Sequence, residues 1–138
     1  MKQILLLSLS SLVLIFLSCS RPYENHKKQG NNISGHLCIS NSKQSFGLIK
    51  QSDKQWPCCE YELKNTGEGD IKIKEINTSC GCISTEIASM HISPGKCTVL
   101  KVMVNPLKQV GHFNKSIFIN SDADNPLEII RIKGNIIP

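Results

Sequence analysis

An all-β fold, an antiparallel β-sandwich of about seven strands, is predicted for this chain of 138 residues by three observations. Short segments with an apolar side chain at every second position follow one another, as in strands that bury one face. Turn-forming sequences rich in Gly, Pro, Asn and Asp separate these segments. No window repeats its apolar residues every 3.6 positions, as an amphipathic helix would.

The expected strands follow from the alternation in each segment. CCEYELKN, residues 58–65, places Cys59, Tyr61 and Leu63 on one face and charged residues on the other. The remaining expected strands cover residues 45–49, 71–76, 98–104, 113–120 and 128–136. Between them lie TGEGD, SPGK, NPLKQVG and SDADNP, which are typical turn sequences. Residues 83–91 fit either a short helix or an extra strand.

The first nineteen residues indicate export. Residues 4–17 are apolar apart from three serines, a length typical of a signal-peptide core and short of the about 20 residues of a membrane-spanning helix. The ending FLSCS resembles a bacterial lipobox, in which lipid is attached to the cysteine. We therefore expect a signal peptide over 1–18, a lipid anchor on Cys19, a flexible tether over 19–35 and one domain over 36–138. An ordinary signal peptide with an incidental cysteine is the alternative.

Charge and composition exclude several functions. The net charge is +5, but the lysines are scattered among acidic residues. We therefore expect no nucleic-acid binding, which needs a basic stripe with stacking aromatic residues. No serine lies in a Gly-x-Ser-x-Gly elbow, and no histidine is spaced to pair with a nucleophile. We accordingly expect no enzyme activity, no cofactor, no metal site and no small-molecule substrate.

Three further stretches carry a resemblance to a known family. YELKNTGEGDIKIKEINTSCGC, then ISPGKCTVLKVMVNP, then GHFNKSIFINSDADNPLEIIRIKGNI resemble the bacterial domain-of-unknown-function 1573 family. Its ordered signatures here include Asn65-Thr66-Gly67, Cys80-Gly81-Cys82, Pro94-Gly95 and Gly134. The resemblance implies an immunoglobulin-like domain in a cell-envelope lipoprotein, related to pilus-chaperone-like sandwiches, and it implies no established activity. Cys58, Cys59 and Cys97 are not part of the family pattern.

The strand order predicts where six cysteines gather. Cys58 and Cys59 open one strand and Cys80 and Cys82 follow the next, so an antiparallel arrangement places all four at one end of the sandwich. Cys97 opens a strand at the other end, which Cys38 can also reach. We therefore expect a thiol cluster of Cys58, Cys59, Cys80 and Cys82, and separately a candidate Cys38–Cys97 disulfide.

Three interpretations of the thiol cluster remain open. It can be structural, as disulfides or buried thiols, which is common in an oxidising compartment. It can be redox-active, because a Cys80–Cys82 disulfide closes a very small, strained ring that Gly81 gives the backbone freedom to form. It can bind a soft metal, although the spacing does not suit a zinc site.

The sequence thus favours a membrane-anchored, non-catalytic binding or organising protein of the cell envelope, at the periplasmic face or the cell surface. We expect a protein partner that contacts its loops or an exposed strand edge. The alternative function is a thiol-based accessory factor that uses Cys80-Gly81-Cys82 for disulfide exchange or soft-metal handling.

Overall fold

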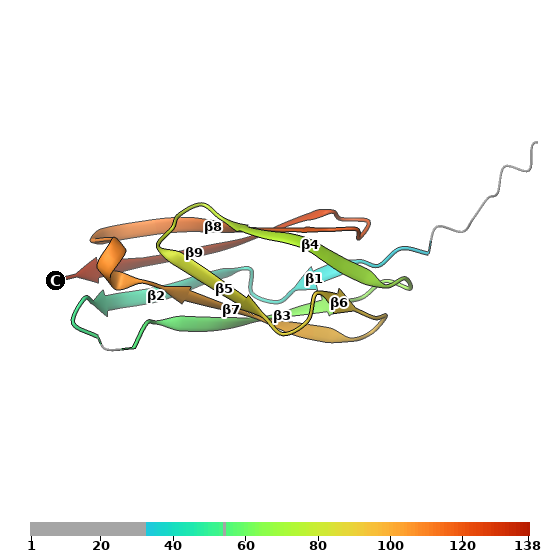
Figure 1. Cartoon of the computed structure of the whole chain (residues 1–138), viewed down its shortest axis with the longest axis horizontal. Coiled ribbons are helices and arrows are strands. Elements are labelled where there is room, and N and C mark those ends of the chain that lie inside the picture. Colours follow the sequence, from blue (N-terminus) through green and yellow to red (C-terminus); the bar gives the residue numbers. More distant parts are fainter. Residues whose placement is uncertain (1–32, 54) are drawn as a thin grey trace, which may run out of the picture.

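Two β-sheets face each other in the structure, a computed structural model that describes residues 33–53 and 55–138 (Figure 1). The expected signal peptide, Cys19 and most of the expected tether lie outside these residues. Sheet A has the order β1-β3-β7-β5 and sheet B the order β2-β9-β8-β4-β6. The strands are β1 (Leu37–Ile39), β2 (Lys43–Lys50), β3 (Cys58–Asn65), β4 (Ile71–Thr78), β5 (Ile83–Ile87), β6 (His91–Ile92), β7 (Cys97–Val104), β8 (Gly111–Ser121) and β9 (Leu127–Ile137), and the 3-10 helix η1 is Pro106–Lys108.

The predicted all-β sandwich is confirmed, with differences in detail. Within the described residues there are nine strands where about seven were expected, because β1 and β6 have only three and two residues. The ambiguous segment after Cys82 forms β5 and the start of β6. Every strand pair is antiparallel except β2 with β9. No helix among the described residues is long and apolar enough to cross a bilayer.

The core lies between the two sheets and is built from the predicted alternating positions. Tyr61 and Leu63 of β3 are buried beside Leu100 and Val102 of β7. Sheet B contributes these residues among others: Ile117, Ile119, Ile130, Ile132 and Ile136. The intervening side chains point to solvent, so the period-two pattern in the sequence corresponds directly to the two faces of each sheet.

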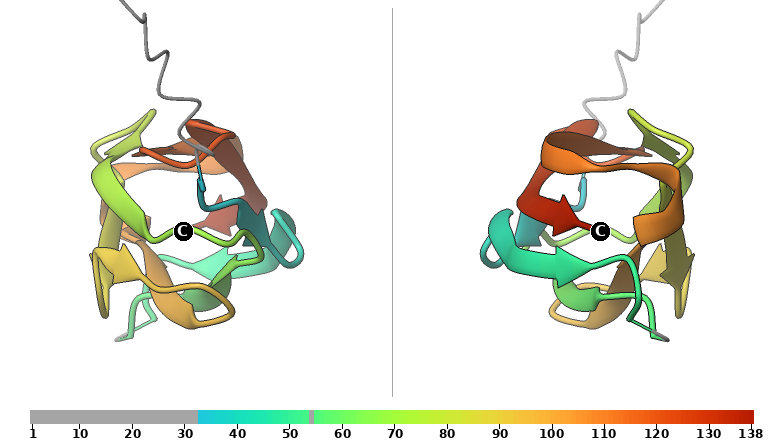
Figure 2. Two further views of the ribbon diagram at one scale, coloured as in Figure 1. Left: turned by 90° about the vertical axis from the view of Figure 1, so that its right-hand side faces the viewer. Right: turned by 90° about the vertical axis from the view of Figure 1, so that its left-hand side faces the viewer.

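Different turns and loops form the two ends of the sandwich, which Figure 1 shows from the side and Figure 2 end-on. The described chain begins at the N-terminal pole, where the turns 66–70, 93–96 and 122–126 meet. The opposite, C-terminal pole holds residues 51–53 and 55–57, the loops 79–82 and 105–110, and the C-terminus. A side chain of Gln51 links two of these loops, since its Nε2 donates to the carbonyl oxygens of Pro106 and Gln109 at 3.1 and 3.4 Å.

The folded domain begins slightly before His36. The carbonyl oxygen of Ser34 accepts from Gly69 N at 3.1 Å, and that of Gly35 accepts from Asp124 N at 3.0 Å. The last two residues of the expected tether are therefore part of the domain. This segment crosses the β3–β4 turn at very short range: a Cβ on Gly67 would lie 2.4 Å from the backbone nitrogen of His36.

Replacing Gly67 with alanine is expected to lower the free energy of unfolding by about 1–3 kcal/mol, because backbone atoms on both sides have no room to give. The matched control is Gly81→Ala in another exposed loop. A Cβ there meets nothing within 4 Å, so its effect should stay within about 0.5 kcal/mol. Urea denaturation of both variants makes the comparison. Equal stability of the two would show that the 33–36 segment does not pack against Gly67.

Candidate functional site

Cys80 and Cys82 are joined by a disulfide at the C-terminal pole. Cys82 is buried and Cys80 is partly buried against the core. The loop is held from outside, since the Cys82 carbonyl oxygen accepts from Asn105 N at 2.8 Å and the Gly81 carbonyl oxygen accepts from Lys108 Nζ at 3.4 Å. Gly81 is exposed and does not have a positive φ. The left-handed conformation that favours glycine is therefore not what this loop uses at position 81.

Cys58 and Cys59 lie near the same pole but do not join the disulfide in one cluster. They open β3, whereas Cys82 precedes β5, and β7 runs between these two strands. Two strand spacings amount to about 10 Å. Cys58 points to solvent and Cys59 into the core, and both are free thiols. The predicted end of the sandwich is correct for all four residues, but the predicted four-thiol cluster is not formed.

The expected Cys38–Cys97 disulfide is also not formed. Cys38 of β1 and Cys97 of β7 both lie opposite Lys64, one on each side of β3. Their Cα atoms are thus two strand spacings apart, about 10 Å, beyond the about 7 Å that a disulfide permits. Both thiols are free and exposed. The sequence correctly predicted that both cysteines lie at the same end of the sandwich, but β3 lies between them and prevents the disulfide.

Burial changes the acidity of two groups on the inner face of β3. Burial raises the pKa of the Cys59 thiol above its ordinary value of 9.0, and Cys58 beside it acts in the same direction. Burial also raises the pKa of the Tyr61 hydroxyl above its ordinary value of 10.0. The two groups also act on each other: the Cys59 thiol raises the pKa of Tyr61 further, and the Tyr61 hydroxyl partly offsets the rise in the pKa of Cys59.

These shifts predict an alkaline loss of stability. Well below pH 9 both groups are neutral in the folded and the unfolded chain. Above pH 9 the unfolded chain ionises Cys59 while the folded chain keeps it protonated, so the free energy of unfolding falls as pH rises. Urea denaturation between pH 7 and pH 10.5 measures the slope. Cys59→Ala should have a shallower slope than the unaltered chain, and identical slopes would contradict this assignment.

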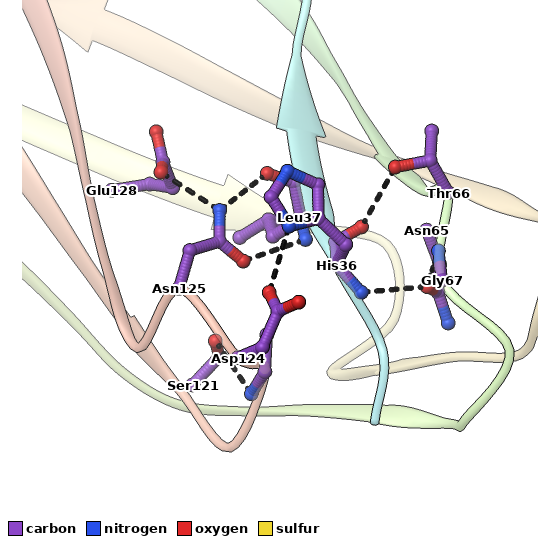
Figure 3. Close-up of polar contacts among 10 residues, drawn as sticks. His36, Leu37, Asn65, Thr66, Gly67, Ser121, Asp124, Asn125 and Glu128 are labelled. Carbon is purple, nitrogen blue, oxygen red and sulfur yellow. Dashed lines mark hydrogen bonds and ion pairs between the residues drawn. The ribbon is translucent and has the colours of Figure 1, made fainter. Parts of the chain in front are cut away.

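The N-terminal pole contains a polar arrangement that holds β1, the N-terminal clamp of Asn65 and Asn125 (Figure 3). The buried Asn65 side chain accepts from His36 N and Gly67 N at 3.2 and 3.0 Å, and it donates to Gly69 O and Ile92 O at 2.7 and 2.9 Å. Asn125 grips the other side of β1: its amide accepts from Leu37 N at 2.9 Å and donates to Leu37 O at 2.8 Å. The clamp fixes where the chain joins the domain.

An exposed side-chain hydrogen bond supplements the clamp. His36 Nδ1 lies 2.7 Å from Asp124 Oδ1, and both side chains are about half exposed; Figure 3 draws this contact as a dashed line. Sequence reasoning missed the whole arrangement. Asn65 could have suggested it, because this asparagine ends an alternating strand and precedes Thr-Gly. Asparagine side chains commonly form hydrogen bonds with the backbone of a turn.

The edge of β3 is only partly covered. β1 pairs with Leu63, Lys64 and Asn65 and then ends, because Asn41 takes a left-handed conformation with φ of 56° and turns the chain toward sheet B. No described strand pairs with the remaining length of β3 on this side. A cleft of about 540 Å³ lies there, lined by Ser40, Asn41, Lys43, Gln44, Ser45, Glu60, Tyr61 and Glu62.

The hydrogen-bonding direction of this edge can be read from β3 itself. Asn65 N donates to Lys96 O at 2.9 Å, toward β7. Because direction alternates along a strand, Glu60 and Glu62 point their N–H and C=O groups away from β7 into the open edge. We call the segment from Cys58 to Glu62 the open edge of β3. Across the described residues, no three His, Cys, Asp or Glu side chains are arranged to hold a metal ion.

Comparisons with solved structures support the fold. A protein of unknown function from Porphyromonas gingivalis W83 superposes with a TM-score of 0.65 at 21% identity, over 73% of this chain and 46% of its own. This chain thus spans about half the length of that protein. A PapD-like domain of human CEP192 gives a TM-score of 0.58 at 12% identity, covering 75% of this chain and 87% of that domain. At these identities the likeness shows the fold alone.

Sequence comparisons show the family. A search of curated proteins finds no significant match. A family model described as "Protein of unknown function (DUF1573)" matches residues 37–136. This range includes all nine described strands, apart from the last residue of β9. The chain therefore belongs to the DUF1573 family.

Proposed function

We propose that this chain is a lipid-anchored, non-catalytic binding domain of the cell envelope, which docks an extended segment of a partner protein beside β3. The observation that carries the proposal is the open edge of β3 next to the 540 Å³ cleft. An unpaired strand edge offers alternating donors and acceptors that an added strand satisfies, a common mode of peptide recognition.

The proposed lipid anchor on Cys19 is supported by the apolar segment that ends in FLSCS. Thirteen residues lie between Cys19 and Ile33, so the two residues can be at most about 50 Å apart. The clamp holds β1 at the N-terminal pole, so a lipid on Cys19 would leave the C-terminal pole and the open edge free for a partner. Confinement to a membrane surface raises the effective concentration of the domain near envelope partners.

The open edge is preferred over other edges for a physical reason. β2 is an edge strand, but its register shifts between Ser45 and Leu48, where Gly47 has a φ of 66°. Such irregularities protect edges from pairing. β6 has only two residues. β5 is open along its outer edge, but it contributes no residue to the cleft beside β3.

The charge of the open edge indicates the partner segment. Glu60 and Glu62 point outward on β3 and are exposed. Two copies pairing through this edge would bring glutamates face to face, which is unfavourable. Lysine or arginine on an added strand would instead lie opposite them, with apolar residues at the alternate positions facing inward. We therefore expect a heterologous partner with an alternating basic and apolar extended segment.

In-cell photocrosslinking tests this proposal. A photoreactive amino acid at Glu60 should give a discrete adduct with one partner, and the same residue at Glu86, on the outer face of β5, should not. Adding Glu62→Pro removes the backbone N–H that points into the open edge, without breaking a hydrogen bond to β7. This variant should abolish the adduct. The control Glu62→Gln keeps that N–H and should keep the adduct. Equal adducts at positions 60 and 86, or none at 60, would refute docking at β3.

A second candidate function is a thiol-based accessory factor, and the observation that favours it is that Cys80 pairs with Cys82 while Cys58 and Cys59 stay free. In an exchange, a partner thiolate attacks one sulfur, the partner's second thiol resolves the mixed disulfide, and two electrons and two protons pass to Cys80 and Cys82. The partner leaves as a disulfide. Mapping alkylated thiols before and after a mild reductant tests this function: a pair that resists reduction excludes it.

A further inference from the structure

Two sulfur atoms are brought together on the outer face of sheet A. Cys58 of β3 lies directly opposite Met103 of β7. Val104 N donates to Pro57 O at 3.0 Å, so the 57/104 pair is hydrogen-bonded and the 58/103 pair is of the non-hydrogen-bonded kind. In such pairs the Cα atoms are about 4.5 Å apart and the side chains are closest.

The sulfur pair opens into a cleft. Gln55, Trp56, Cys58, Lys101 and Met103 line a space of about 490 Å³ at the C-terminal pole end of sheet A. Cys58 is an exposed free thiol, Met103 is half-buried, and the Trp56 side chain is 42% exposed. Thiol, thioether and indole therefore share one accessible site.

These groups have a common chemical preference. Thiolate and thioether are soft ligands that select soft ions such as Cu(I), and the face of an indole attracts a cation. We propose that Cys58 and Met103 bind a soft monovalent metal ion, Cu(I) in chemical class, through their two sulfur atoms, with the Trp56 ring covering it. Each ion bound displaces one proton, because the thiol becomes a thiolate.

Local charge is compatible with this site. The Lys101 ammonium in the cleft lies in register between Glu60 of β3 and Glu86 of β5. Two carboxylate residues on the neighbouring strands therefore flank the one charged residue that lines the cleft.

The other described cysteines lack this arrangement and supply controls. Cys38 and Cys97 are free and exposed like Cys58, but each lies opposite Lys64 instead of a thioether. Cys80 and Cys82 are joined in a disulfide, and Cys59 is buried. The proposal is independent of strand docking and of exchange at Cys80–Cys82.

The test uses Ag(I), a soft monovalent ion that needs no reductant, so the Cys80–Cys82 disulfide stays intact. The full chain, as its host processes it, is purified anaerobically in mild detergent and titrated with Ag(I). Trp56 is the single tryptophan of the sequence, so its fluorescence reports on this cleft alone. Proton release per ion is recorded in parallel.

With Cys38 and Cys97, the other exposed free thiols, both replaced by serine, we expect fluorescence to change and saturate at one equivalent of Ag(I), with one proton released. Cys58→Ser and Met103→Leu should each weaken the effect at least about tenfold, whereas Cys97→Ser and Cys38→Ser should leave it unchanged. Circular dichroism confirms the fold of each variant. An unchanged response in Cys58→Ser or in Met103→Leu would overturn the proposal, as would equal loss in Cys97→Ser or a titration without any tryptophan response.

Discussion

Replacing Asn65 with alanine is expected to lower the free energy of unfolding by about 3–5 kcal/mol. Asn65 is fully buried, and its amide makes four hydrogen bonds that join β1, the β3–β4 turn and β6. Each bond contributes about 1 kcal/mol, and backbone groups left buried without a partner add their desolvation cost. Urea denaturation of the domain measures the change.

Thr66→Val is the matched control for this variant. Thr66 is the next residue, exposed, and its hydroxyl makes one weak bond of 3.3 Å to His36 O. Its loss should cost less than about 1 kcal/mol. If Asn65→Ala were as mild as Thr66→Val, the clamp would not be the element that holds β1 to the domain.

Truncating Leu100 to alanine is expected to cost about 2–5 kcal/mol, the range for a large side chain removed from a packed core. Leu100 is fully buried on β7, between Tyr61 of β3 and Ile87 of β5 in register. Thermal unfolding followed by circular dichroism detects the change.

Val99→Ala on the same strand is the control, because Val99 faces solvent and is 41% exposed. It should change stability by about 0.5 kcal/mol or less. A cost at Val99 equal to that at Leu100 would mean that the two faces of β7 are assigned the wrong way round.

The sequence predicted the fold well because burial in a sandwich leaves a direct period-two signal. The alternation in CCEYELKN and TVLKVMV corresponds to β3 and β7 almost residue for residue. Where the register shifts, between Ile73 and Glu75 of β4, the alternation changes phase and the simple pattern fails. The three-residue β1 and two-residue β6 are too short to leave any periodic signal.

The site was predicted less well because pairing across strands is not local. Strand direction alone was enough to predict the end of the sandwich at which each cysteine lies. Which strand separates Cys38 from Cys97, and which separates Cys59 from Cys82, depends on the order within sheet A. Likewise the Cys58–Met103 pair joins residues that are distant in sequence, and only the register brings them together.

The open edge was expected only in general terms. The sequence favoured an exposed strand edge without naming one, since each predicted strand has two. The decisive feature is Asn41, whose left-handed conformation ends β1 after three residues. Asparagine tolerates this conformation better than most residues do, but nothing in the local pattern says which neighbouring strand is thereby uncovered.

Amide hydrogen exchange would test docking at β3 most directly, measured by NMR on the isotope-labelled chain with and without a synthetic peptide of alternating Lys and Val. The account predicts that the amides of Glu60 and Glu62 become protected when the peptide is added. The amides of Thr85 and Ile87, which point outward from the edge of β5, should stay unprotected. Protection confined to β5, or no new protection at Glu60 and Glu62 at saturating peptide, would contradict the account.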